Sequence, residues 1–478
     1  MIMKETILKY HRPIIWSLLI FQLLLFTINI PGLYVDFDDA WLGEQAIMFA
    51  REGIVRSEMF QDYLGYNERI LVYHKAFIWT GGLFIKLLGQ SLYSLRLVSI
   101  LFGIILGAML YLFCKRYYNS TIFRLTLIIL LACPLIFRYT VLFRPEVMLA
   151  AFGFISFFLL YEFINSNKSG FLILSAIFAG LSVLVHLNGV IFIGAGGILL
   201  LFNRRWGGFA AFSVISIIFA SLYFYEALGS MELFRLQFAG DPSHAGKNLQ
   251  WYMPFENLIN EHKRLFRKPE IIGITVLFLL TVFYQIKSKA SKDKSILIYI
   301  FSMIILLGMI SHNKTTKFYG IMLFPYFALM AAQNIYLLLT EPERLKSFIQ
   351  KTFVVMLASV FIFGIFYSFQ IILTGKEDWA AKHKAVASHM PRDSRVFVPM
   401  GFIYNEIDNY DIVALHLARL TMWARGGDFN AESLCSLADE FSAEYIVIDE
   451  KYRTLLDCNS GDTTCLECGQ YKYLASEY

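Results

Sequence analysis

The sequence is dominated by apolar runs that are long enough to cross a lipid bilayer. A helix needs about 20 apolar residues to span roughly 30 Å of hydrocarbon. Such runs lie at residues 13–33, 92–114, 121–139, 146–164, 208–228, 270–286, 295–311, 319–340 and 350–374. Only 17% of the residues are charged, against roughly 25% in soluble domains. The chain therefore has too few charged residues to cover the surfaces of several soluble domains. These features predict a polytopic α-helical membrane protein.

A further apolar stretch, residues 170–202, is long for one span and short for two. If it breaks near His186–Gly189 into two short spans, the inner loops hold 16 basic residues and four acidic ones. Reading it as a single span would place Arg204 and Arg205 outside, against the positive-inside rule. We therefore expect 11 spans, with a cytoplasmic amino terminus and a first span that is retained as an uncleaved anchor.

The sign of the charge changes near residue 375. From Gly375 onward the chain holds 10 Lys and Arg and 17 Asp and Glu, a net charge of 10 − 17 = −7, whereas the whole chain carries +5 and the remainder therefore +12. We expect two domains: a basic membrane body at residues 1–374 and an acidic extracytoplasmic domain at 375–478. The long outer loops of the body are 34–91, with an interfacial apolar stretch at 77–89, and 229–268. Chemistry is therefore expected on the outer face.

The acidic domain has the pattern of a small α/β fold. Short β-branched runs predict strands at 396–398 and 445–448, and helices are expected at 409–424 and 431–442. Four of the six cysteines lie here: Cys435, Cys458, Cys465 and Cys468. An oxidising compartment favours disulfides between them, with three pairings open, and a zinc site is the alternative.

Carboxylates gather at two outer positions. Asp36, Asp38 and Asp39 follow the first span directly. Crowded carboxylates repel one another, which can raise a pKa and create a base, or they can bind a cation; a solvated acidic loop is the alternative. Glu146, next to Arg144 and Pro145, begins a span, where it caps the helix or faces the first loop as a second carboxylate.

Basic residues on the outer face run against the positive-inside trend. Arg96, Arg144, Lys314 and Lys317 belong to this group. Each one alone is explained by contact with lipid headgroups, but as a group they could hold a phosphate. His186, at the break in the 170–202 stretch, is a satisfied turn residue or part of a site.

In their order along the chain, these motifs resemble those of the GT-C glycosyltransferases. The similarity is to the branch that holds the protein O-mannosyltransferases and the lipid A aminoarabinose transferases, and it spans most of residues 1–340. It is carried by Asp38-Asp39-Ala40, Leu95-Arg96, Arg144-Pro145-Glu146, residues 180–189 and Lys317-Phe318-Tyr319 with Pro325. The sequence departs from the family pattern before the interfacial helix, where His74-Lys75-Ala76 stands in place of Pro-Pro.

The resemblance implies transfer of a sugar from a polyprenyl-phosphate donor to a lipid, glycan or protein acceptor. It implies a single displacement with inversion at the outer face of the plasma membrane, by default a bacterial inner membrane. The implied catalytic residues are Asp38, Asp39 and Glu146, those for the donor phosphate are Arg96, Arg144, Lys314 and Lys317, and those for other parts of the substrate are His186 and Tyr319. No cofactor and no nucleic-acid partner are expected. A divalent metal at Asp36 and Asp38 is the alternative, since they form an Asp-x-Asp motif.

Three other functions fit a membrane body of this kind. A transporter or flippase of a lipid-linked sugar usually has ionisable residues in mid-span and repeated halves. In this sequence most charges lie at the ends of the spans, and no repeat is visible. A glycan polymerase or ligase would use the same kind of carrier. A non-catalytic scaffold would leave the acidic cluster without a role.

Overall fold

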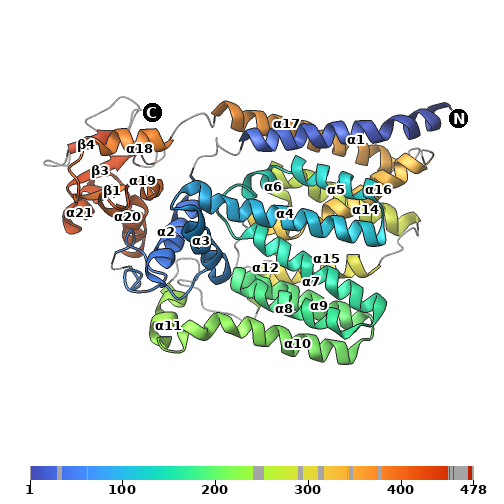
Figure 1. The fold of residues 1–478 in the computed structure, drawn as a ribbon, viewed down its shortest axis with the longest axis horizontal. Helices are drawn as coiled ribbons and strands as arrows, with labels where there is room; N and C mark the ends of the chain where they lie inside the picture. Colours follow the sequence, from blue (N-terminus) through green and yellow to red (C-terminus); the bar gives the residue numbers. More distant parts are fainter. Residues whose placement is uncertain are drawn as a thin grey trace.

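The computed structural model describes residues 2–29, 35–61, 63–240, 252–288, 294–310, 317–341, 343, 348–374, 379–449, 452, 456 and 472–475. Over these residues the chain forms a large body of packed helices with a small sheet at one end (Figure 1). Five helices are long and apolar enough to span a membrane: α4 (Leu92–Tyr117), α7 (Glu146–Ser166), α10 (Trp206–Ser221) with its extension η2 (Leu222–Ala227), α14 (Pro269–Ser288) and α17 (Phe348–Thr374).

Six shorter apolar helices complete the body within the described residues. They lie in α1 (Ile2–Asn29), α5 (Ser120–Ala132), α8 (Ser169–Val185), α9 (Val190–Phe202) together with η1 (Leu187–Gly189), α15 (Lys294–Ile310) and α16 (Phe324–Thr340). The stretch 170–202 is thus divided into two helices at the predicted place. The number of spans and their orientation stay predictions.

The helices differ in how far they are enclosed by the rest of the protein. The most apolar window of α7 is 72% buried, whereas those of α10 and α17 are 17% and 22% buried. Helix α7 is therefore central, and α10 and α17 turn apolar side chains outward, as lipid contact requires. In Figure 1, α17 lies beside α1 at the upper edge of the body and α10 lies along the lower edge.

Short helices gather at the end of the body that faces the sheet. Helix α2 (Phe37–Glu52) is preceded by its N-cap residue, Asp36, whose side chain accepts a hydrogen bond from the Phe37 amide. It packs against α3 (Lys75–Leu88), which contains the predicted interfacial stretch. The others are α6 (Pro134–Tyr139), α11 (Met231–Gly240), α12 (Met253–Asn260), α13 (His262–Phe266) and η3 (Lys317–Met322).

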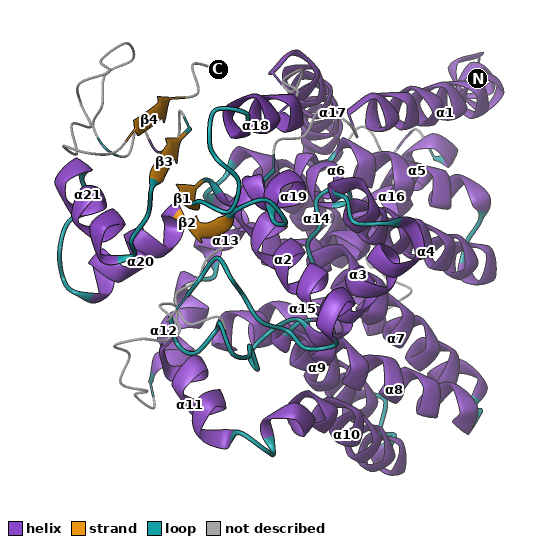
Figure 2. Ribbon diagram, turned by 60° about the vertical axis from the view of Figure 1, so that its left-hand side comes forward, coloured by secondary structure: helices purple, strands orange, loops and turns teal. Residues whose placement is uncertain are grey.

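The sheet of the C-terminal region has four parallel strands in the order β2-β1-β3-β4 (Figure 2). The strands are β1 (Arg395–Val398), β2 (Asp411–Ala414), β3 (Tyr445–Ile448) and β4 (Lys472–Ala475). The helical elements are α18 (Trp379–Ala387), η5 (Met400–Phe402), α19 (Ile403–Glu406), α20 (Leu415–Ala424) and α21 (Ala431–Glu440). The predicted helix at 409–424 is wrong at its start, because residues 411–414 form β2. A buried apolar run this short does not distinguish a strand from a helix by periodicity.

The cysteine prediction falls largely outside the described residues. Cys435 is disulfide-bonded, whereas Cys458, Cys465 and Cys468 lie outside the described residues. The three pairings therefore stay open.

Candidate functional site

A polar cavity of about 450 Å³ lies where α2, the loop before α3, the start of α7, the α8–α9 break and η3 meet. Five residues proposed from the sequence line it: Asp38, Arg144, Glu146, His186 and Tyr319. They come from four separate parts of the chain, so the fold brings together motifs that are distant in sequence. Aromatic side chains form much of the remaining wall, among them Trp41, Tyr66, Tyr73, Tyr223 and Phe318.

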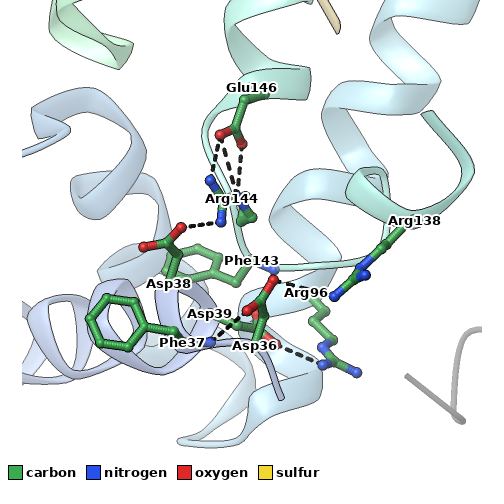
Figure 3. A network of polar contacts seen from close by, with 9 residues as sticks. All are labelled: Asp36, Phe37, Asp38, Asp39, Arg96, Arg138, Phe143, Arg144 and Glu146. Atoms are coloured by element: carbon green, nitrogen blue, oxygen red, sulfur yellow. Dashed lines mark hydrogen bonds and ion pairs between the residues drawn. The ribbon is translucent and has the colours of Figure 1, made fainter. Parts of the chain in front are cut away.

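Arg144 lies between two carboxylates of the cavity (Figure 3). Its Nη2 is 2.8 Å from Oε1 of Glu146, and its Nη1 pairs with Oδ2 of Asp38. The guanidinium also lies 4.4 Å from the centre of the Phe318 ring, a cation–π contact. Two carboxylates therefore share one arginine, and this trio carries a negative charge when both are ionised.

Asp38 is the carboxylate of this trio that a substrate can reach. Its side chain is 36% exposed, against 3% for Glu146 and 6% for Arg144. Desolvation by the surrounding protein raises the pKa of Asp38, the pairing with Arg144 opposes that rise, and the negative charges of Glu146 and Asp36 add to it. An accessible carboxylate with a raised pKa has the properties of a general base.

Asp39 and Arg96 form a separate buried pair outside the cavity. Oδ2 of Asp39 is 2.7 Å from Nη2 of Arg96, and neither side chain is more than 2% exposed. Oδ1 of Asp39 accepts a hydrogen bond from the Phe143 amide at 2.6 Å. The pair therefore joins α2, α4 and the loop before α7. The structure does not bring Asp39 or Arg96, both proposed for the site, to the cavity wall.

His186 lies at the break between α8 and α9, stacked on a second histidine. The ring centroids of His186 and His74 are 4.6 Å apart, and that of Tyr319 lies 5.2 Å from His186. The Asn188 amide donates a hydrogen bond to Nδ1 of His186. Burial lowers the pKa of His74 to about 4, so this ring is neutral at neutral pH. His74 was not predicted as a site residue, although it stands where the family pattern has Pro-Pro.

An ion pair between a buried lysine and a partly exposed glutamate lies beside the aromatic wall. Nζ of Lys75 is 2.5 Å from Oε2 of Glu226, and the Tyr73 hydroxyl also donates a hydrogen bond to Glu226. Lys75 is 1% exposed and lies 4.2 Å from the centre of the Tyr73 ring. Sequence analysis did not predict this group, because Glu226 lies within the predicted span 208–228 and its contact with Lys75 is a tertiary one.

The remaining predicted residues are placed only in part. Lys314 lies outside the described residues, and Lys317 opens η3, with a side chain that is also outside them. Asp36 is 3.3 Å from Arg138 and caps α2, so Asp36 and Asp38 pair with different arginines. Among the residues that the structure describes, no three His, Cys, Asp or Glu side chains are grouped to hold a metal ion.

Comparison with known proteins supplies one family match. Residues 76–224 match the family model described as dolichyl-phosphate-mannose-protein mannosyltransferase. No curated protein matches the chain.

Several solved structures share the fold at low sequence identity. ArnT from Cupriavidus metallidurans bound to undecaprenyl phosphate is 12% identical, with a TM-score of 0.59 over 88% of this chain and 90% of ArnT. The apo state of the same protein is also 12% identical, with a TM-score of 0.56 over 84% of this chain and 86% of ArnT. The apo oligosaccharyltransferase of Archaeoglobus fulgidus is 12% identical, with a TM-score of 0.54 over 95% of this chain and 72% of that protein.

Proposed function

Since the chain has the fold of GT-C membrane glycosyltransferases and matches a mannosyltransferase family model over residues 76–224, we propose that it transfers a sugar from a polyprenyl-phosphate donor. The acceptor is a lipid, a glycan or a protein on the extracytoplasmic face. ArnT, a structural relative, has been solved with undecaprenyl phosphate, which supports a donor of this class. A plasma membrane, by default a bacterial inner membrane, is the proposed location.

One observation carries the proposal: a single cavity joins an accessible carboxylate, an arginine and a wall of aromatic rings. Aromatic side chains offer flat apolar faces with polar edges, which suit the faces of a sugar ring. The apolar helices around the cavity suit a donor that is anchored in the bilayer by its lipid.

Asp38 is the proposed base. An acceptor hydroxyl is a poor nucleophile, and a carboxylate beside it can take its proton in the transition state. The raised pKa of Asp38 increases its proton affinity, while Arg144 favours its ionised form at neutral pH. The acceptor oxygen then bonds to the anomeric carbon from the face opposite the phosphate, which inverts the configuration.

Arg144 is the proposed partner of the leaving phosphate. As the bond between the anomeric carbon and the phosphate oxygen breaks, that oxygen keeps the electron pair, and a nearby guanidinium stabilises the charge. Lys317 and Lys314 are proposed as further cations, since η3 also supplies Phe318 and Tyr319 to the cavity wall. Glu146 orients Arg144, and His186 and Tyr319 contact the substrate.

Asp39 and Arg96 are proposed to act indirectly. Their buried pair fixes the start of α2 against the loop that carries Arg144, so that Asp38 and Arg144 meet. No cofactor is required in this proposal, and a divalent cation at Asp36 and Asp38 is the less favoured alternative.

Purified protein with a synthetic polyprenyl-phosphate sugar and a membrane extract tests the proposal. The measured quantity is the polyprenyl phosphate that is released. Asp38→Asn should reduce turnover by about 10²- to 10⁴-fold. Asp408→Asn is the matched control, because Asp408 is an exposed carboxylate that also pairs with an arginine, Arg51. Equal turnover by Asp38→Asn and the wild type would remove Asp38 from the mechanism.

The same assay separates the alternative functions. Turnover with lipid-linked oligosaccharides but with no monosaccharide carrier would indicate a polymerase or ligase. Movement of the carrier between leaflets without release of polyprenyl phosphate would indicate a flippase.

A further inference from the structure

We propose that Tyr404, in the C-terminal region, is a positioning residue that holds helix α2 so that Asp38 faces the cavity; this rests on the proposed function. The Tyr404 hydroxyl donates a hydrogen bond of 2.5 Å to the main-chain carbonyl oxygen of Asp39. Tyr404 lies in α19 and is 6% exposed. The bond therefore reaches, from the far end of the chain, the residue that follows the proposed base.

Gly43 gives the Tyr404 hydroxyl the space to reach this carbonyl. In a helix the carbonyl of Asp39 faces residue 43, four positions later. A Cβ atom built on Gly43 would overlap the Tyr404 hydroxyl and its ring. Glycine weakens a helix interior, so its presence in the middle of α2 is explained by the approach of Tyr404.

A second contact joins the C-terminal region to the other neighbour of Asp38. The ring of His416, in α20, lies 4.1 Å from that of Phe37. Both residues that flank Asp38 in the sequence, Phe37 and Asp39, therefore contact the C-terminal region. A shift of that region would turn the first residues of α2 and move Asp38 away from Arg144.

A third contact joins the edge of the sheet to the first outer loop. The Ala414 amide, at the end of the edge strand β2, donates a hydrogen bond of 3.1 Å to the Met59 carbonyl. Nε2 of Gln61 donates to Asp411 at 2.7 Å. Phe60, between them, lies 4.4 Å from the Trp41 ring, which lines the cavity. Figures 1 and 2 show the sheet region beside α2, so the three contacts act on one side of the site.

Two substitutions test the proposal with two matched controls. Tyr404→Phe removes the hydroxyl, and Gly43→Ala closes the space for it. Tyr410→Phe removes a hydroxyl that donates to the Ala387 carbonyl, within the C-terminal region itself. Gly207→Ala adds a Cβ in α10, where nothing lies within 4 Å.

Both test variants should lower kcat by about 10-fold or more, because small displacements of a catalytic group are costly, while KM for the donor changes less than twofold. Both controls should keep the wild-type kcat. The double variant should be no worse than the poorer single one, since both act on one contact. A kcat for Tyr404→Phe equal to that of Tyr410→Phe would overturn the proposal.

Hydrogen–deuterium exchange of residues 37–52 separates this proposal from the proposed function. The test variants, and not the controls, should exchange faster there. If the wild type does not turn over the donor but exchange rises in the test variants, the proposed function is wrong. The contact between Tyr404 and α2 is then real but has no catalytic role. Unchanged exchange, or raised exchange with an unchanged kcat in an active enzyme, contradicts the positioning role.

Discussion

At the scale of single residues, the three aspartates at the start of α2 have different roles because their side chains point in different directions. Successive residues of a helix are rotated by about 100°, so Asp38 and Asp39 point in different directions although they are adjacent. Asp36 caps the helix and pairs with Arg138, Asp38 faces the cavity, and Asp39 is buried against Arg96. Of these three aspartates, only Asp38 lines the cavity.

The pH dependence of turnover should report the environment of Asp38. A base must be ionised, so kcat/KM should fall as the pH drops through the pKa of Asp38, which is raised. Glu146→Gln removes a negative neighbour that contributes to this rise, so the acid limb should move to lower pH. A pH–rate profile of both proteins measures the shift. An acid limb at the same pH in both proteins would mean that the ionisation of another group limits the rate.

The buried pair of Asp39 and Arg96 should matter for stability. Arg96→Met leaves the Asp39 carboxylate buried without its ion pair, which typically costs about 3–5 kcal/mol. Thermal unfolding in detergent should show a large loss of Tm. Arg51→Met is the control: Arg51 pairs with Asp408, which is 67% exposed, and such pairs contribute about 0–1 kcal/mol. Similar losses for both variants would contradict the structural role of Arg96.

Only some of these residue roles could be predicted from the sequence. The cluster at 36–39 and the Arg144–Glu146 motif were found from residue type and position, and the fold brings Asp38, Arg144 and Glu146 to one cavity. Which aspartate faces the cavity depends on the exact residue at which α2 begins, and residue composition does not define a helix start that precisely. The His74–His186 stack depends on tertiary contact between distant segments, so it had no local signal.

At the scale of elements, the break between α8 and α9 positions the part of the site around His186. A Cβ atom on Gly189 would overlap the main chain and side chain of Ser182, whose hydroxyl also donates to the Gly189 carbonyl at 3.1 Å. The two helices therefore end and begin close together only because residue 189 has no side chain.

Gly189→Ala should consequently displace His186 and lower turnover by about 10-fold or more. Gly170→Ala is the control, because it adds a Cβ in α8 where nothing lies within 4 Å. Turnover with the donor checks both variants. Wild-type turnover by Gly189→Ala would show that the break tolerates a side chain.

The loop after α2 is held by a buried carboxylate, Glu44. It accepts hydrogen bonds from the Ser57 hydroxyl at 2.5 Å and from the Glu58 and Met59 amides at 2.8 and 2.9 Å. Burial nevertheless raises the pKa of Glu44 to about 7. The neutral form is therefore favoured more by the folded state than by the unfolded one.

The sign of this shift predicts how stability depends on pH. The contribution of Glu44 is complete below about pH 4.5, the ordinary value for the unfolded chain, and is lost as the pH rises through about 7. A shift of this size corresponds to about 3 kcal/mol. Between pH 5 and pH 8, Tm should fall more steeply in the wild type than in Glu44→Gln. Parallel profiles would contradict this effect.

Element boundaries were predictable in proportion to the length of the apolar pattern. Most long runs of the body coincide with helices, including the divided stretch at 170–202. Two predicted spans differ: the run 121–139 is divided into α5 and α6 where Pro134 begins the second helix, and the run 319–340 begins in η3 before α16 starts at Phe324. The C-terminal region was less predictable: β2 was predicted as the start of a helix, since its three buried apolar residues are too few to show a distinguishing period. The hydrogen bond from the end of that strand to the first outer loop is a tertiary contact, which periodicity does not report.

At the scale of the whole molecule, charge should decide orientation in the membrane. We expect the loop with Arg204 and Arg205 in the cytoplasm and the C-terminal region outside. Fusions of green fluorescent protein and of alkaline phosphatase after residue 205 and after residue 478 measure this. Fluorescence at the first position and phosphatase activity at the second would fit the topology. The reverse pattern would place the cavity on the cytoplasmic side and contradict the proposed donor geometry.

The hydrogen bond between Tyr404 and Asp39 joins residues that are 365 positions apart. During biosynthesis the ribosome makes the helix that carries Asp38 long before it makes Tyr404. The helices between them are inserted into the bilayer before this contact can form. We therefore expect a nascent chain that does not yet contain Tyr404 to lack the contact, so that the proposed transfer activity would be acquired only late in maturation.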